Sequence, residues 1–381
     1  MNSLRHILSN PRYLGPAWVF ASLNILFGTW VIYIPTIKEN LGIDKSQLGI
    51  AIFFLSLGVF TVFPIAARII DKIGVGKATW YGLILLCAAA ILPMMSHDYY
   101  TLMASLFVFG ASSGFVDISM NTLVTEIEKE DQRQFMTASH GFFSLGGVLA
   151  GLGSFLILLL GNPVVHMSIA IVLVFAINFF LYKNYVHIKA EPVKKQAFSL
   201  KVFKPLLLLG LISFVSMGSE GAIIDWSGLY LKEVSMAPQT LWGLGFLGFQ
   251  LTMSLGRFLG DGISSRIGSV PMLVLGTVLA MIGYVLVLTT NTYMAILGFA
   301  LSGLGFSVMV PEVFRIGGKV EGVKSSHGIA FIAGTGYAGF LCAPPILGFL
   351  ADISSLKLSF IALLCCTIPI LCASFLLQRK S

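Results

Sequence analysis

The chain has 381 residues, of which 56% are hydrophobic and 11% are charged. A soluble domain carries roughly 25% charged residues, so this composition excludes a soluble globular protein and predicts an integral membrane protein. The apolar residues come in runs of roughly 20, long enough to cross a bilayer as helix, which excludes an outer-membrane barrel of short alternating strands. The net charge of +7 comes from basic residues between these runs, where membrane topology explains them, so nucleic acid is not an expected partner.

The apolar runs, taken in chain order, predict twelve membrane-spanning helices. The first six are expected at residues 14–36, 46–69, 78–95, 102–125, 135–160 and 164–181. The second six are expected at residues 205–229, 240–258, 270–289, 293–314, 329–350 and 358–377. The predicted fold class is therefore an all-α membrane protein with two six-helix halves, at residues 1–182 and 205–381, joined by a cytoplasmic linker at residues 183–204.

The distribution of lysine and arginine predicts the orientation. Of the 24 basic residues, all except Lys38, Lys45, Lys232 and Lys357 fall on the N-terminal side of the predicted topology. Cytoplasmic segments carry the excess of basic residues in membrane proteins. Both termini are therefore expected in the cytoplasm, and a bacterial inner membrane is the expected location of this multi-pass protein.

The two predicted halves resemble each other in sequence. Ser139-His140-Gly141 recurs as Ser326-His327-Gly328, near the starts of the fifth and eleventh spans. The segment from Asp71 to Gly74 recurs as Ser265-Arg266-Ile267-Gly268, after the second and eighth spans. Matches in the same order predict two repeats related by an axis along the membrane normal, an arrangement found in transporters.

Between the second and third spans lies Ala67-x-x-x-Asp71-Lys72-x-Gly74-x-x-Lys77, which resembles the motif Gly-x-x-x-Asp-Arg-x-Gly-Arg-Arg of the major facilitator superfamily. The match is degraded, because Ala67, Lys72 and the Val75-Gly76 pair depart from the family's pattern. Within the family, the stretches Gly114-Phe-Val-Asp117 and Glu220-Gly221-x-x-x-Asp225-Trp226-Ser227 resemble a poorly characterised bacterial branch near the fucose permeases. The resemblance implies alternating access around a central cavity lined by spans one, four, seven and ten.

Acidic residues within the spans are the first functional candidates, because a carboxylate at bilayer depth is costly and by default marks a pathway or a proton relay. Asp117 in span four and Glu220 and Asp225 in span seven are the candidates for proton coupling. A break at Gly218 and Gly221 would let both acids of span seven reach one cavity. The alternatives are that Asp117 is a structural hydrogen-bonding group and that Asp225 lies at the outer surface beside an interfacial Trp226.

Two further sets of residues are predicted to act on solute or on the conformational change. The candidates for substrate binding, through hydrogen bonding or ring stacking, are Asn24, Trp30, Ser113, Asn121, Gln250 and Trp226. The candidates for gate contacts are Asp71, Lys72, His140, Arg257, Asp261, Glu312, Arg315 and His327. Simple packing is the alternative for Trp30, and a structural contact is the alternative for the two histidines.

The sequence contains no GxxxxGK[ST] nucleotide-binding loop, so transport, if present, is secondary rather than ATP-driven. The leading hypothesis is proton-coupled uptake of a small polar solute, for example a sugar. The alternatives are a proton-driven exporter of amphiphilic or cationic compounds and a non-transporting membrane receptor. No enzymatic activity, cofactor or metal ion is expected. The expected partners are the solute, protons and the lipid bilayer, and the expected state is a monomer.

Overall fold

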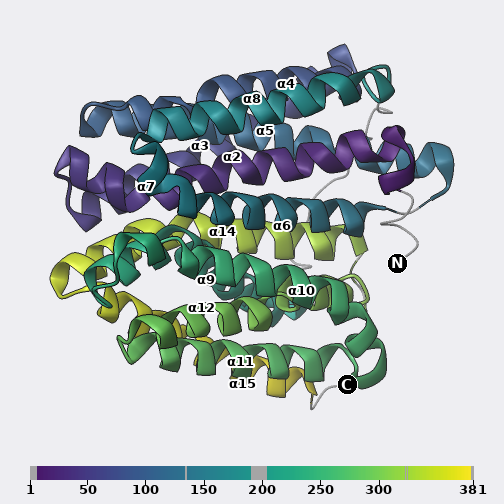
Figure 1. The fold of residues 1–381 in the computed structure, drawn as a ribbon. Helices are drawn as coiled ribbons and strands as arrows, with labels where there is room; N and C mark the ends of the chain where they lie inside the picture. Colours follow the sequence, from purple (N-terminus) through teal and green to yellow (C-terminus); the bar gives the residue numbers. More distant parts are fainter. Residues whose placement is uncertain (1–6, 134, 190–203, 322, 324, 379–381) are drawn as a thin grey trace. The chain divides into compact units, whose positions relative to one another are not determined.

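The computed structural model describes residues 7–133, 135–189, 204–321, 323 and 325–378. The chain divides into two compact units, unit 1 from residues 1–43 and 50–194 and unit 2 from residues 44–49 and 195–381. Among the described residues the regular structure of both units is helical, without a strand. The helices of each unit lie side by side along a common direction (Figure 1).

Unit 1 contains the first six predicted spans. Its elements are α2 (Pro11–Leu41), α3 (Lys45–Ile73), α4 (Val75–Ala90), η1 (Leu92–Met95), α5 (Tyr99–Asp131), α6 (Met136–Leu152), η2 (Gly153–Leu156), α7 (Ile157–Leu160), α8 (Pro163–Leu181) and η3 (Tyr182–Asn184). Helix α6 continues through η2 into α7, and the three together form the expected fifth span.

Unit 2 contains the last six predicted spans. Its elements are α9 (Leu207–Glu233), η5 (Gln239–Leu241), α10 (Leu244–Ile267), α11 (Ser269–Leu288), α12 (Thr292–Phe306), α13 (Met309–Gly317), α14 (Ser325–Ile353) and α15 (Leu356–Gln378). Unit 2 also includes the first turn of α3, where the backbone N–H groups of Lys45 and Ser46 donate to the carboxylate of Asp352.

Each of the twelve predicted spans corresponds to one helix or to two or three consecutive helical elements, so the predicted fold class is confirmed. Eleven helical segments in the described parts of the chain are long and apolar enough to cross a membrane. The remaining predicted span, the eighth, corresponds to α10. With 24 residues it has the length of a span, but Arg257, Asp261 and Arg266 make it less apolar than the others.

Polar side chains mark the starts of several helices. A short side chain that precedes a helix can accept hydrogen bonds from the first free backbone N–H groups. The Asp98 carboxylate accepts from the backbone N–H groups of Tyr100 and Thr101 before α5. In return the Thr101 side-chain oxygen accepts from the backbone N–H of Asp98, which completes a capping box. Side-chain oxygens of Asn10, Asn162 and Asn291 cap α2, α8 and α12 in the same way.

The internal repeat is visible in the backbone of the two units. Gly74 before α4 has φ 88° and ψ 146°, and Gly268 before α11 has φ 90° and ψ 162°. Positive φ at this angle suits glycine because it has no Cβ. In unit 1 the Asn24 side chain donates to the carbonyl of Phe143, and in unit 2 the Ser213 hydroxyl donates to the carbonyl of Ile332, each at 2.9 Å across 119 residues.

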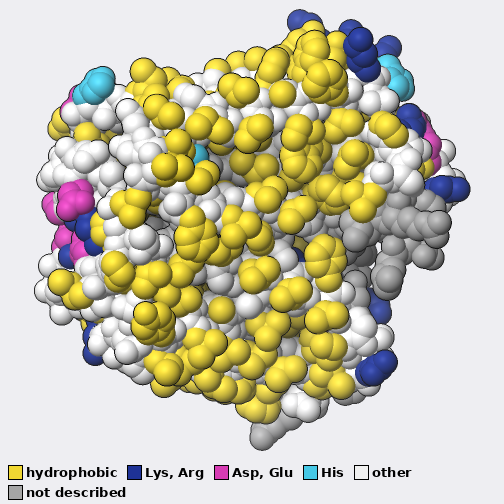
Figure 2. All heavy atoms as spheres, viewed as in Figure 1, with side chains coloured by type: hydrophobic (Ala, Val, Ile, Leu, Met, Phe, Trp, Pro, Cys, Tyr) yellow, Lys and Arg dark blue, Asp and Glu magenta, His cyan; other side chains and the backbone are white. Residues whose placement is uncertain are grey.

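Large apolar side chains are exposed on several helices. In unit 1, α8 exposes Val172, Leu173 and Phe180, and in unit 2, α11 exposes Leu275 and Val285. Apolar side chains dominate the face of the molecule drawn in Figure 2, with charged side chains toward its margins. Contiguous exposed apolar surface of this extent is the surface that lipid chains cover in a membrane protein.

Candidate functional site

Helix α9 carries Glu220 at its centre and is continuous. It runs from Leu207 to Glu233, so the break expected at Gly218 and Gly221 is absent from this described helix. The two glycines instead allow close packing on α14: a Cβ at Gly221 would lie 2.5 Å from the ring of Phe340, and one at Gly218 would lie 3.2 Å from the carbonyl oxygen of Gly339. Small residues let two helix backbones approach in this way.

Arg257 lies inside helix α10 and not at its end. The predicted eighth span stopped at residue 258, which placed Arg257 at the cytoplasmic face, but α10 continues to Ile267. Ten further residues of helix extend about 15 Å beyond Arg257. The predicted end of the eighth span at residue 258 is therefore too early, and Arg257 does not belong to the loop residues whose count predicts the orientation.

Glu220 and Arg257 form an ion pair between the centres of α9 and α10. A guanidinium nitrogen of Arg257, Nη2, lies 3.4 Å from Oε1 of Glu220. The Arg257 side chain is 26% exposed, and the Glu220 side chain is 13% exposed. Opposite charges at this distance offset part of the cost of placing each in an apolar environment. Arg257 is thus the partner of the central acid of span seven.

Further polar groups lie near this pair on the same two helices. Gln250 and Ser254 precede Arg257 by seven and three residues, a spacing that puts all three on one side of α10. Ser216 precedes Glu220 by one helical turn. Gln250 is buried, and the hydroxyls of Ser216 and Ser254 have no hydrogen-bond partner among the described residues. We call Ser216, Glu220, Gln250, Ser254 and Arg257 the unit 2 polar cluster.

Asp225 and Trp226 do not belong to this cluster. Asp225 lies five residues after Glu220, which is about 140° around a continuous helix, on the side where Gly218 and Gly221 meet α14. It is 7% exposed, and in the described structure its Oδ1 has no hydrogen-bond partner. Trp226, a predicted substrate-binding residue, is fully buried, which contradicts the alternative that it lies in an interfacial aromatic belt.

Asp117 lies on α5, half-buried, and is hydrogen-bonded within its own helix. The Asn121 side chain donates to the backbone oxygen of Asp117 at 2.8 Å and to its carboxylate at 3.2 Å. The small residues on this side of α5 pack on α3, because a Cβ at Gly110 would lie 1.9 Å from the carbonyl oxygen of Leu55. The Ser113 hydroxyl donates to Phe109 in the preceding turn. These contacts favour a structural role for this stripe.

The two candidates on α2 lie in the packed interior of unit 1. Asn24 is 1% exposed and uses its amide nitrogen to hold α6 through Phe143. Trp30 is fully buried, and its ring nitrogen has no hydrogen-bond partner among the residues that the structure describes. Both side chains therefore act in helix packing in this structure.

The gate candidates fall in separate places. Glu312 and Arg315 pair on α13 at 2.9 Å as their spacing predicts, and Arg315 also donates to Ser264 of α10 at 2.7 Å. Exposed His140 packs edge-to-face on Phe20. Asp71 and Lys72 line a pocket at the junction of α3 and α4. The side chains of Asp261 and His327 lie outside the described structure.

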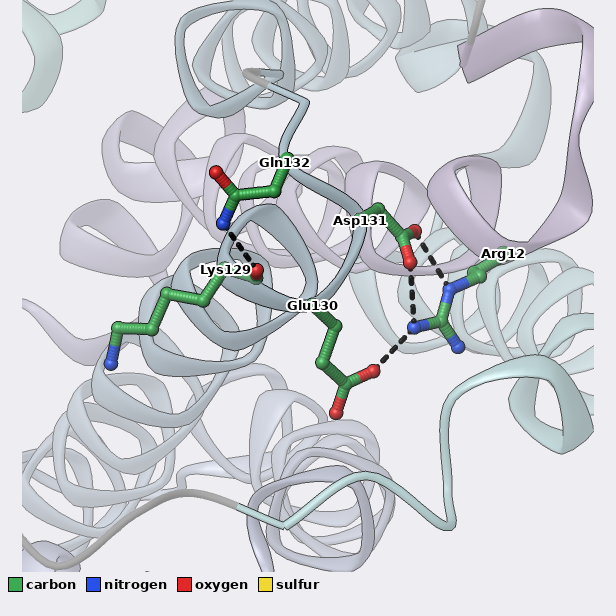
Figure 3. Close-up of polar contacts among 5 residues, drawn as sticks. All are labelled: Arg12, Lys129, Glu130, Asp131 and Gln132. Carbon is green, nitrogen blue, oxygen red and sulfur yellow. Dashed lines mark hydrogen bonds and ion pairs between the residues drawn. The ribbon is translucent and has the colours of Figure 1, made fainter.

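Two contacts of unit 1 have no signal in the sequence. Figure 3 shows the Arg12 guanidinium at the start of α2 directed between Glu130 and Asp131 at the end of α5, with Nε 2.9 Å from Oδ2 of Asp131. Farther along α2, the Tyr33 hydroxyl lies 3.1 Å from Nδ1 of buried His166 on α8. Each contact joins residues more than 100 positions apart, which no local pattern predicts.

Comparison with known proteins gives the family. The model of the Major Facilitator Superfamily matches residues 18–311. An uncharacterized MFS-type transporter of Yersinia pestis is 30% identical over 345 residues, covering 89% of this chain and 89% of that protein.

Solved transporters have the same fold. The nucleoside transporter NupG aligns with a TM-score of 0.73 at 14% identity, over 97% of this chain and 99% of its own. The E. coli fucose:proton symporter FucP aligns with a TM-score of 0.64 at 17% identity, over 95% of this chain and 97% of its own. The resemblance seen in the sequence is thereby confirmed, and this chain belongs to the major facilitator superfamily.

Proposed function

We propose that this member of the family is a proton-coupled carrier for uptake of a small polar solute, and that the unit 2 polar cluster binds both the proton and the solute. The observation that carries the proposal is the Glu220–Arg257 ion pair halfway along two membrane-spanning helices. Two structural neighbours support the solute class, because one is a nucleoside transporter and the other a fucose:proton symporter.

The pair couples proton and solute through competition for Arg257. A proton that binds the Glu220 carboxylate removes its negative charge, and the attraction that holds Arg257 is lost. The guanidinium, which has five N–H donors and no acceptor, can then donate to hydroxyl or carbonyl oxygens of a solute. The side chains of Gln250, Ser216 and Ser254 supply further donors and acceptors.

Loss of the proton reverses this competition. The charged carboxylate draws Arg257 back, and the solute loses its strongest donor. Because each ligand changes the affinity of the other by the same factor, the protonated carrier binds solute more tightly than the deprotonated one. Alternating access then moves the two ligands together, as in transporters built from two repeats.

Asp117 and Asp225 are secondary proton-binding candidates in this proposal. Asp117 is already hydrogen-bonded to Asn121 in its own helix, and Asp225 lies on another side of α9 from Arg257. We place the carrier in a bacterial inner membrane as a monomer with both termini in the cytoplasm. The excess of basic residues on the terminal side supports this orientation, also without Arg257.

A thermal-shift screen of the purified carrier with nucleosides, sugars, amino acids and lipophilic cations tests the proposal. A solute at about 100 times its Kd stabilises the folded state by about 2.7 kcal/mol, which raises the melting temperature measurably. We expect a nucleoside or a sugar to raise it for wild type and for Glu220→Gln, whose side chain resembles the protonated acid, and not for Arg257→Gln.

Arg266→Gln is the matched control, because Arg266 is an exposed arginine of the same helix α10. It should keep the full shift. Stabilisation by lipophilic cations alone would contradict uptake of a polar solute and favour an exporter. An equal shift in wild type and Arg257→Gln would contradict the proposed site.

A further inference from the structure

A basic pocket lies at the junction of α3 and α4 in unit 1. It encloses about 500 Å³ and is lined by Asp71, Lys72, Ile73, Gly74, Lys77, Tyr81 and Lys189. Three lysines therefore face one aspartate. The volume lies within the range of small-molecule sites, which is roughly 300–1,000 Å³. Neither the proposed solute site nor the gate hypothesis accounts for three cations gathered at one pocket.

The walls of this pocket are held by backbone contacts. Gly74 turns the chain between α3 and α4 at a φ of 88°. The N–H group of Gly76 then donates to the carbonyl of Ile188 at 3.0 Å, and a Cβ at Gly76 would lie 2.1 Å from the carbonyl oxygen of Tyr185. The segment after α8 is thereby fixed against the start of α4, which brings Lys189 to the pocket that Lys72 and Lys77 line.

The side of α4 next to the pocket changes from basic to apolar. Lys77 is followed at helical spacing by Tyr81 and Leu85, whose side chains are 52% and 58% exposed. Tyrosine is favoured at the membrane–water boundary, and an exposed leucine beyond it suits the hydrocarbon region. This order of a cation, an amphipathic ring and an apolar surface matches the phosphate, the ester region and the acyl chain of a phospholipid.

We propose that this pocket binds an anionic phospholipid, with the phosphate among Lys72, Lys77 and Lys189 and an acyl chain along Tyr81 and Leu85. Lysine ammonium groups bind phosphate as point charges, and lysines near an anionic leaflet are attracted to it. The predicted orientation places this side of unit 1 on the cytoplasmic leaflet. Bound lipid would join the end of α3, the start of α4 and the segment after α8.

Native mass spectrometry of the detergent-purified carrier, titrated with phosphatidylglycerol, measures this binding directly. We expect a bound lipid whose affinity falls at least about tenfold in the triple variant K72Q/K77Q/K189Q, since three favourable charges are lost. Lys183→Gln is the matched control, because Lys183 is an exposed lysine of the same segment after α8 and does not line the pocket. It should bind as wild type does.

Three additional titrations identify what the pocket recognises. Phosphatidylcholine should bind no better to wild type than to the triple variant, and inorganic phosphate and glycerol 3-phosphate should bind at least about tenfold more weakly than the lipid. Equal binding of inorganic phosphate and lipid would make this a free-anion site and overturn the proposal. Equal lipid affinity of wild type and the triple variant would also overturn it. If the triple variant does not fold, single variants at Lys72 and Lys77 make the same comparison.

Discussion

Replacing Gly339 with alanine is expected to lower the stability of unit 2 by about 1–3 kcal/mol or more, the usual cost of overpacking. Gly339 lies on α14 where this helix meets α9. An added Cβ would lie 2.0 Å from the carbonyl oxygen of Phe214 and 3.1 Å from the backbone nitrogen of Gly218. Because these are backbone atoms of a helix, no side chain can rotate away, and the two helices must separate.

Gly334 on the same helix is the matched control for this substitution. A Cβ at Gly334 would meet nothing within 4 Å, and alanine is the better helix former of the two residues. Thermal unfolding of the purified carrier, followed by intrinsic fluorescence, should show a marked fall for Gly339→Ala and none for Gly334→Ala. Equal melting temperatures of the two variants would contradict the close contact of α9 with α14.

Removing one charge of the Glu220–Arg257 pair should cost more stability than removing both. A partner left behind is an uncompensated charge in an apolar setting, with a cost of about 3–5 kcal/mol for a fully buried pair. Arg257 is 26% exposed, so we expect a smaller effect of about 1–3 kcal/mol. Glu220→Gln should be the worse single variant, because an arginine cannot give up its proton whereas a glutamate can take one.

A double-mutant cycle measures this coupling. Melting temperatures are compared for Glu220→Gln, Arg257→Gln and the double variant, with Arg266→Gln as the control for loss of an arginine from α10. The double variant should be more stable than Glu220→Gln alone, since neither charge is left without a partner. If the effects of the two single variants add, the two side chains do not interact, and the polar cluster loses its basis.

The sequence predicts the helices of this fold well because membrane spans have a strong physical signature. Twenty apolar residues form a helix whose backbone groups bond to one another, since the hydrocarbon core offers them no other partner. The repeat is predicted for a similar reason. Gly74 and Gly268 occupy matching turns that need a positive φ, so the same short motif marks both.

The site is predicted less well because its contacts join distant parts of the chain. The acids of span seven are predicted from the free-energy cost of a carboxylate in an apolar segment. The charge of Arg257, in contrast, predicts the end of its apolar run, because charges commonly end such runs. The helical spacing of Arg257 and Asp261, four residues apart, is the local signal that α10 continues past residue 258. The pairs Arg12–Asp131 and Tyr33–His166 have no such signal.

Transport by Glu220→Gln in proteoliposomes, with the solute that the thermal-shift screen identifies, tests whether Glu220 couples protons to solute. Exchange of labelled for unlabelled solute needs only solute binding and alternating access, whereas accumulation driven by a proton gradient also needs a group that takes up and releases a proton. We expect Glu220→Gln to retain exchange and to lose proton-driven accumulation. Accumulation at the wild-type level by this variant would contradict the claim that Glu220 couples protons to solute.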